Sequence, residues 1–137
     1  MKKNLLFLCT GNSCRSQIAE GFGKKYLTEY NIFSAGTISQ GINPNAIKTM
    51  NEIDIDISNQ ISKKINLNDL NNYDLIITLC GDARDKCPVF KNNTKHIHWG
   101  LKDPASITGN NEQISKGFSD IRDKILKYIK GLKETKI

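Results

Sequence analysis

Two short, almost unbroken apolar runs stand out along the chain, Asn4–Leu8 and Asp74–Leu79. Runs that are apolar without alternation predict strands buried on both faces, as in a parallel sheet. The shorter stretches Ile32–Ala35, closed by Gly36, and His96–Trp99 predict two further strands. The pattern therefore predicts a sheet of about four strands.

Apolar residues at helical spacing predict three helices between and after these strands. They cover residues 14–30, 43–53 and 114–132. Ser13 is placed to cap the first helix, and Pro44 suits the first turn of the second. Strands that alternate with helices predict an α/β fold, a doubly wound parallel sheet with helices on both faces.

The length of 137 residues predicts a single domain spanning residues 1–137. A hydrophobic fraction of 38% beside 25% charged residues is typical of a soluble globular protein. The longest apolar run, Leu5–Cys9, is too short to span a membrane and lacks the features of a signal peptide. We therefore expect a cytoplasmic protein with no membrane partner, and a monomer, because no apolar segment is left over.

The formal net charge of +6 is compatible with nucleic acid, an anionic membrane or a small anion as partner. The lysines are scattered, however, and are densest in the predicted C-terminal helix. No stacking aromatic residues are interleaved with them, as a nucleic-acid site would require. We expect a solvated helix face and no nucleic-acid partner.

The four cysteines stand at positions 9, 14, 80 and 87. Without an export signal they are poor candidates for structural disulfides, because cytosolic thiols are kept reduced. A zinc site would require paired cysteines or a histidine cluster, whereas His96 and His98 alternate on a short strand and are interpreted as packing or surface residues. Reactive thiols are the favoured interpretation, and no metal site is predicted.

A polar loop from Cys9 to Ser16 joins the first predicted strand to the first helix. Successive backbone N–H groups in such a loop, the helix N-terminus and the forked guanidinium of Arg15 favour a tetrahedral oxyanion. The same field favours the Cys9 thiolate as nucleophile, and Ser16 can donate a hydroxyl to it. The alternative is an ordinary strand-to-helix turn with a buried cysteine. The predicted oxyanion-binding residues are Thr10, Gly11, Asn12, Ser13, Cys14, Arg15 and Ser16.

A second polar segment starts at Cys80, at the carboxyl end of a predicted strand, and ends at Cys87. It has almost no apolar anchor, so Cys80 could reach Cys9 and later pair with Cys87. Spacing alone equally allows one core cysteine and one loop cysteine. Asp103, before Pro104, is likewise either a general acid or an ordinary turn aspartate.

The loop CTGNSCRS at Cys9–Ser16 resembles the one shared by low-molecular-weight protein tyrosine phosphatases and the thioredoxin-coupled arsenate reductases of the same fold. Further matches lie along nearly the whole chain, at Glu20, Phe33–Gly36, Asn43-Pro44, Asp54–Ser58, Thr78–Cys80, Cys87-Pro88, His98–Gly100 and Asp103-Pro104. Gln17 replaces a usual proline of the phosphatases, and Ala105 stands where they usually carry aromatic residues. The resemblance therefore favours the reductase branch.

This resemblance implies arsenate reduction for detoxification, with phosphate and sulfate as substrate analogues. Cys9 would attack arsenic while Asp103 protonates the leaving hydroxyl. Cys80 would then attack Cys9 and release arsenite, and Cys87 would attack Cys80, leaving a Cys80–Cys87 disulfide for thioredoxin to reduce. The resemblance implies no bound redox cofactor, no redox step for Cys14 and weak phosphatase activity.

Some reductases of this family bind potassium beside the loop, with groups that correspond to Asn12, Glu20, Ser34 and residues near Ile61 and Lys63. Ile61 and Lys63 break that pattern, since they replace a threonine and a carboxylate. We expect weak or no potassium binding, with Lys63 paired to Glu20 instead.

Two other functions remain open. A low-molecular-weight tyrosine phosphatase would use Cys9, Arg15 and Asp103 but would not need Cys80 and Cys87. A non-catalytic oxyanion-binding module would only hold phosphate or sulfate in the loop, and consumption of reductant on addition of arsenate distinguishes it from the reductase.

Overall fold

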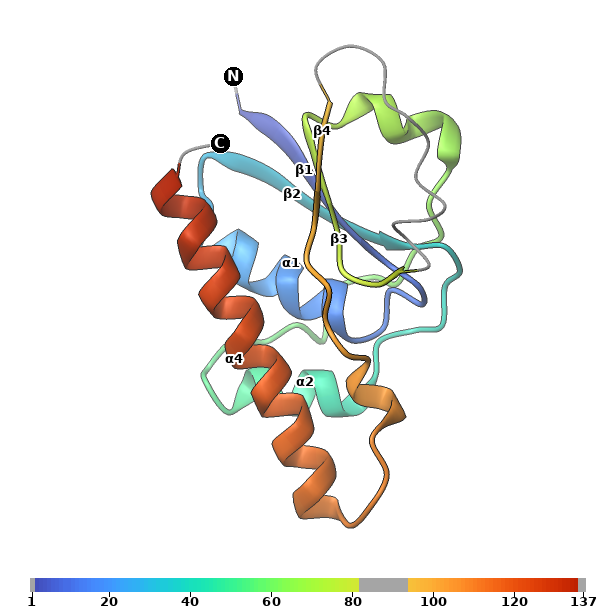
Figure 1. Ribbon diagram of the computed structural model, residues 1–137, viewed down its shortest axis with the longest axis vertical. Coiled ribbons are helices and arrows are strands. Elements are labelled where there is room, and N and C mark those ends of the chain that lie inside the picture. Colours follow the sequence, from blue (N-terminus) through green and yellow to red (C-terminus); the bar gives the residue numbers. More distant parts are fainter. Residues whose placement is uncertain (1, 82–93, 136–137) are drawn as a thin grey trace.

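The computed structural model describes residues 2–81 and 94–135 (Figure 1). Its elements follow one another as β1 (Lys3–Cys9), α1 (Arg15–Tyr26), β2 (Tyr30–Gly36), α2 (Pro44–Asn51), the 3₁₀ helix η1 (Leu67–Asn72), β3 (Leu75–Thr78), β4 (Lys95–His98), the 3₁₀ helix η2 (Pro104–Ser106) and α4 (Asn111–Thr135). This order alternates strands with helices as the sequence pattern predicts. Cys87 and most of the 80–87 segment lie outside the described residues.

The four strands form one parallel sheet in the order β2-β1-β3-β4. The two central strands, β1 and β3, are the two apolar runs of the sequence, and both are almost entirely buried. The predicted fold class is confirmed. Because all strands run in the same direction, Cys9, Gly36, Thr78 and His98 end their strands at one edge of the sheet.

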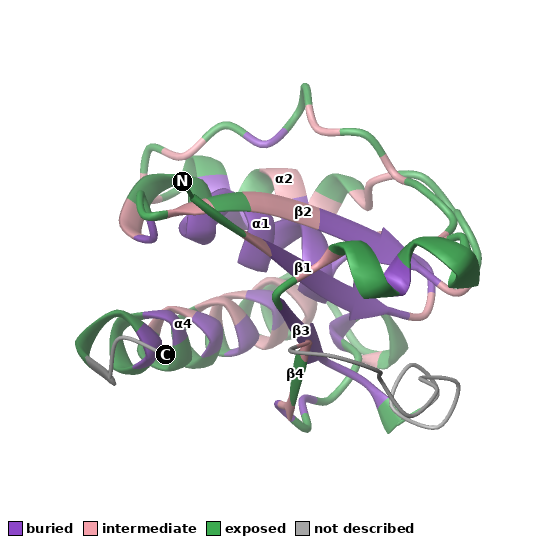
Figure 2. Ribbon diagram, turned by 90° about the horizontal axis from the view of Figure 1, so that it is seen from above, coloured by how far each residue is buried: buried purple, intermediate pink, exposed green. Residues whose placement is uncertain are grey.

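Helices α1 and α4 pack on one face of the sheet, where the rings of Phe7 and Trp99 lie 5.9 Å apart. Figure 2 shows the carboxyl-terminal parts of β1 and β2 as buried. Alternate side chains of the strands face the side of the sheet opposite to α1 and α4. There the ring of Phe33 meets that of Tyr73 edge-on at 5.6 Å. Apolar side chains therefore pack against both faces of the sheet.

Several element boundaries differ from the predictions. Helix α2 ends at Asn51 rather than at Ile53. Helix α1 ends at Tyr26 rather than near Tyr30, because the chain turns at Leu27 and enters β2. The predicted Ser13 cap is wrong: Cys14 is the N-cap residue and its side chain makes no capping bond. Strand β4 ends at His98, whereas α4 runs beyond the predicted 114–132 in both directions.

Within the described ranges, no helix combines the length and apolar character needed to cross a bilayer.

Candidate active site

The backbone carbonyl groups that point outward from the loop between β1 and α1 accept hydrogen bonds from neighbouring segments. The carbonyls of Cys9, Thr10, Gly11 and Ser13 accept backbone N–H groups from the 37–43 segment at 2.9–3.0 Å. The Asn12 carbonyl accepts the Gln17 side-chain amide at 3.1 Å. A peptide N–H points opposite to the carbonyl before it, so this pattern directs the loop's N–H groups inward. The N-terminus of α1 carries no side-chain cap and opens on the same cradle, which favours an anion.

Asn12 holds the loop in shape from within. Its backbone is left-handed, with φ of +49°, a conformation that asparagine tolerates better than most residues. Its buried side-chain amide donates to Ser16 Oγ at 2.8 Å and to Ser34 Oγ at 2.9 Å. Its Oδ1 accepts the backbone N–H of Lys63 at 2.8 Å and the Gln17 amide at 3.0 Å. The loop is thus tied to β2 and to the 61–63 segment through one side chain.

The Cys9 thiol lies 2.8 Å from Ser16 Oγ and is only 2% exposed. Because Asn12 already donates to the Ser16 oxygen, the Ser16 hydroxyl hydrogen is available for the Cys9 sulfur. The chain of donors therefore runs from Asn12 through Ser16 to Cys9. This order allows the Ser16 hydroxyl to donate to the Cys9 sulfur, the contact that the sequence analysis predicted.

Arg15 and Asp103 lie close together beside the loop. Arg15 is buried, and its Nη1 donates to the Leu101 carbonyl at 2.9 Å. Its Nη2 lies 4.0 Å from Asp103 Oδ2, whose side chain is 47% exposed. Asp103 also accepts the Ala105 N–H and so begins η2. The structure thus brings the predicted oxyanion clamp and the predicted general acid together.

The Cys80 thiol lies 3.0 Å from the hydroxyl of Thr10, the residue next to Cys9. It is buried, and Leu79 before it bonds to the Leu8 carbonyl of β1. The Cys80 thiol, which comes from a different segment of the chain, therefore contacts the loop that holds Cys9. The third thiol of the predicted relay, Cys87, is outside the described residues, so its place in the relay stays a prediction.

Cys14 lies within the loop with its thiol buried in the protein. Burial raises the pKa of this thiol to about 12, while the hydroxyl of Ser13 opposes the shift. Such a thiol remains protonated near neutral pH and is a poor nucleophile.

Glu20 is paired, but not with the lysine that the sequence suggested. Its Oε2 accepts Lys24 Nζ at 2.6 Å and its Oε1 accepts the Ser34 hydroxyl at 2.5 Å. The predicted pair with Lys63 is therefore wrong: Lys24 stands one helical turn away on α1, which already fixes the distance, whereas Lys63 belongs to a separate, exposed segment. The oxygens that a cation would need already accept hydrogen bonds from an ammonium group, a hydroxyl and amides. Weak or absent potassium binding stays a prediction.

Several contributors to the site were not identified from the sequence. The Leu101 carbonyl that holds Arg15 is a backbone group and leaves no signal in the sequence. Gln17, noted only as a replacement for proline, donates to Asn12 and to the Ile61 carbonyl. The signal that the sequence offered was a polar residue in the first turn of the predicted helix, directly after the loop.

The two histidines share one buried hydroxyl below the site. Thr78 Oγ1 lies 2.9 Å from His96 Nε2 and 2.8 Å from His98 Nδ1. Thr78 has one hydrogen, so it donates to one imidazole at most and accepts from the other. Burial lowers the pKa of His96, and His98 lowers it further. From the sequence, both histidines are interpreted as packing or surface residues, and their hydrogen bonds to Thr78 are not predicted.

Comparisons with known proteins cover almost the whole chain. Residues 4–136 match the family described as low molecular weight phosphotyrosine protein phosphatase. An arsenate reductase of Shouchella clausii (strain KSM-K16) is 53% identical over 135 residues, which are 98% of this chain and 97% of that protein.

Two solved structures share the fold. An arsenate reductase in the phosphate-binding state superposes with a TM-score of 0.77 at 32% identity, over 98% of both chains. The tyrosine phosphatase Wzb from Escherichia coli K30 in complex with sulphate superposes with a TM-score of 0.82 at 20% identity, covering 98% of this chain and 99% of that one. At that identity the second likeness shows the fold alone.

Proposed function

The chain belongs to the low molecular weight phosphotyrosine protein phosphatase family, and within this family we propose that it reduces arsenate to arsenite by a relay of three cysteines. The observation that carries the proposal is the Cys80 thiol at 3.0 Å from Thr10, on the loop that holds Cys9. Hydrolysis of a phosphate ester needs one nucleophilic thiol, whereas reduction of arsenate needs a second thiol, because two thiols supply the two electrons when they form a disulfide. The 53% identity to an arsenate reductase supports the same function.

The first step joins arsenic to Cys9. The inward N–H groups of the loop and Arg15 bind the oxyanion, and the Cys9 thiolate attacks arsenic. Asp103, at the exposed rim, protonates the hydroxyl that leaves as water. Arsenic is still in its pentavalent state in this adduct, and no electron has left the protein.

The second step transfers the electrons. The Cys80 thiolate attacks the sulfur of Cys9, the sulfur–arsenic bond breaks, and its electron pair leaves with arsenic as arsenite. A Cys9–Cys80 disulfide forms, so two thiols are oxidised while arsenic is reduced from the pentavalent to the trivalent state. Thr10 supports this step, since its hydroxyl contacts the attacking sulfur.

The third step restores the loop. The Cys87 thiolate attacks Cys80, Cys9 leaves as a thiolate, and a Cys80–Cys87 disulfide remains. A dithiol protein such as thioredoxin then reduces this disulfide. The cysteines carry the electrons themselves, so the proposal needs no bound redox cofactor.

The test follows NADPH consumption when reduced protein is mixed with arsenate, thioredoxin and thioredoxin reductase. We expect arsenate-dependent oxidation in the wild type and its loss in Cys80→Ser and Cys87→Ser. Phosphate in place of arsenate is the matched control, because it occupies the same loop but accepts no electrons. Without thioredoxin, Cys87→Ser should accumulate a Cys9–Cys80 disulfide that peptide mass spectrometry identifies.

Two results would contradict the proposal. No arsenate-dependent oxidation, with phosphate-ester hydrolysis intact in the wild type and both variants, would make the protein a phosphatase. Full oxidation in Cys80→Ser would show that Cys80 has no part in the relay.

A further inference from the structure

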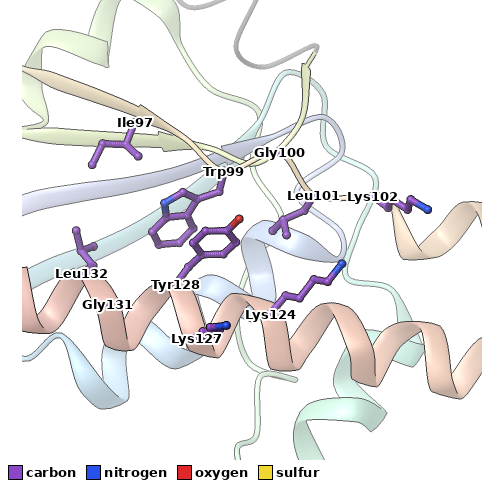
Figure 3. Close-up of a pocket in the computed structure, with 10 residues that line it drawn as sticks. All are labelled: Ile97, Trp99, Gly100, Leu101, Lys102, Lys124, Lys127, Tyr128, Gly131 and Leu132. Carbon is purple, nitrogen blue, oxygen red and sulfur yellow. The ribbon is translucent and has the colours of Figure 1, made fainter.

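A groove of about 810 Å³ lies between the end of β4 and helix α4 (Figure 3). Its walls come from the segment that follows β4 and from the C-terminal half of α4. None of the described cysteines lines it, and neither does Arg15 or Asp103. The groove therefore lies beside the anion loop rather than in it, with Leu101, whose carbonyl accepts Arg15 Nη1, between the two. Its volume lies within the range of small-molecule sites.

An aromatic pair forms the floor of the groove. Trp99, on the sheet side, stacks on Tyr128 of α4 with 5.0 Å between ring centroids and 14° between ring planes. Trp99 is only 7% exposed and is fixed from behind by Phe7, whereas Tyr128 is 43% exposed. Leu101 adds an aliphatic wall beside the rings, as Figure 3 shows. The floor thus offers a rigid, partly accessible aromatic surface to a flat ring.

The charged side chains that line the groove in the described part of the chain are positive. Lys102, Lys124 and Lys127 line it, and none of its lining residues in the described chain is acidic. Asp123 and Glu134, the acidic residues of this part of α4, line a neighbouring hollow, which shares Lys127 and Gly131 with the groove. An apolar, aromatic floor with ammonium groups at the rim complements a molecule that is both flat and anionic.

We propose that this groove binds a small planar aromatic anion, such as an aryl sulfonate, carboxylate or phosphate. The ring packs beside Tyr128 and Trp99, and the anionic group is held by Lys124 and Lys127. An extended acidic polypeptide fits less well, because it offers charge without a flat ring for the aromatic floor. A second copy of this chain fits poorly too, since both copies would bring lysines to the contact.

The probe is 8-anilinonaphthalene-1-sulfonate, with N-phenyl-1-naphthylamine as the matched neutral compound that lacks only the sulfonate. The chain has one tryptophan, Trp99, so its indole N–H gives a single resonance in an ¹H–¹⁵N spectrum. We expect the sulfonate to shift this resonance saturably at one equivalent. The neutral compound should bind about tenfold more weakly, because it leaves the lysines unpaired. Excess phosphate, which occupies the anion loop, should leave the sulfonate's affinity unchanged.

Charge-reversal variants separate the groove from the general charge of the protein. Lys124→Glu/Lys127→Glu should weaken the sulfonate about tenfold, and Tyr128→Ala by a similar factor. The matched control is Lys130→Glu/Lys133→Glu on the same helix, which changes the net charge equally but lies outside the groove lining and should alter affinity less than twofold.

Four outcomes would overturn the proposal: an unmoved indole resonance, equal affinity for the neutral compound, equal loss in the control variant, or displacement by phosphate. Binding of polyglutamate but not of the sulfonate would assign the groove to an acidic protein instead. None of these readouts uses arsenate turnover, so they are independent of the proposed function.

Discussion

Thr10 and Cys80 are 70 positions apart in the chain, yet the Thr10 hydroxyl lies 3.0 Å from the Cys80 sulfur. The contact arises because β1 and β3 are parallel neighbours, so both residues follow strand ends at one edge of the sheet. In the proposed reaction one residue of the oxyanion loop therefore also positions the second thiol. Thr10 would thus take part both in the loop that binds the oxyanion and in the contact that positions Cys80 for electron transfer.

Thr10→Val should slow the second step of the proposed reaction. The change keeps the shape but removes a hydroxyl bonded to the attacking sulfur, and a hydrogen bond to a charged group contributes about 1.5–3 kcal/mol. We expect turnover with arsenate to fall by roughly 10- to 100-fold, while phosphate affinity, measured by calorimetry, changes little. Thr10→Ser should restore most of the rate. Equal turnover in Thr10→Val would exclude this role.

Gly36→Ala should distort the anion loop and destabilise the protein. A Cβ at Gly36 would lie 2.4 Å from the Ile38 carbonyl oxygen and 2.5 Å from that of Thr10. We expect a loss of about 2–3 kcal/mol in urea unfolding, because backbone on both sides must move. Gly131→Ala in α4 is the control: its Cβ meets nothing within 4 Å, and helix propensity favours alanine by about 1 kcal/mol. Similar stability of the two variants would contradict this view of Gly36.

Cys14 should resist alkylation in the folded protein. Burial raises its pKa to about 12, so almost no thiolate is present near neutral pH. Reduced protein treated briefly with iodoacetamide at neutral pH, then digested and analysed by mass spectrometry, should retain an unmodified Cys14. The same treatment in urea should label it. Rapid labelling of Cys14 before unfolding would show that its thiol is accessible and ionised.

Stability should fall as the solution is acidified below the ordinary histidine pKa of 6.5. Burial and His98 lower the pKa of His96 in the folded state, so the unfolded chain takes up a proton at higher pH than the folded chain. This contribution is complete above pH 6.5 and is lost as the pH falls through the lowered value. Melting temperatures of wild type and His96→Gln measured across this range test it. The variant should show a shallower decline, and an identical slope would rule His96 out as the cause.

Potassium should stabilise the protein no more than sodium does. Glu20 already accepts Lys24 Nζ at 2.6 Å, and an added cation would have to displace it. Melting temperatures in equal concentrations of the two chlorides should agree for the wild type. Lys24→Gln removes the competing ammonium group and should respond more to potassium. A clear potassium effect in the wild type would overturn the assignment.

The fold was predictable because its two central strands are apolar throughout and because turn residues follow each of them. The loop from Cys9 to Ser16 was predictable for a related reason, since strand, loop and helix are contiguous and Cys9 and Arg15 stand near its ends. Features whose residues are close together in the chain, such as the central strands and this loop, could therefore be predicted from the sequence.

What escaped prediction depends on contacts between distant segments. Leu27 extends the helical pattern of α1, yet the turn that leads into β2 ends the helix earlier. The pairing of Glu20 is an exception, since Lys63 was expected because it replaces a carboxylate of a related site. The observed partner, Lys24, stands four residues along the same helix and could have been predicted from that spacing. The bond that Thr78 makes with His96 and His98 needs the register of β3 against β4, which one sequence does not provide.

The bond from Arg15 to the Leu101 carbonyl has an entropic consequence. An arginine side chain free in solution loses considerable rotational freedom when it clamps an anion, and that loss weakens binding. Here folding has already removed this freedom, and the remaining N–H groups of the guanidinium are oriented before any anion arrives. In the proposed reaction, the segment that follows the edge strand β4 would thereby contribute to oxyanion affinity without touching the oxyanion.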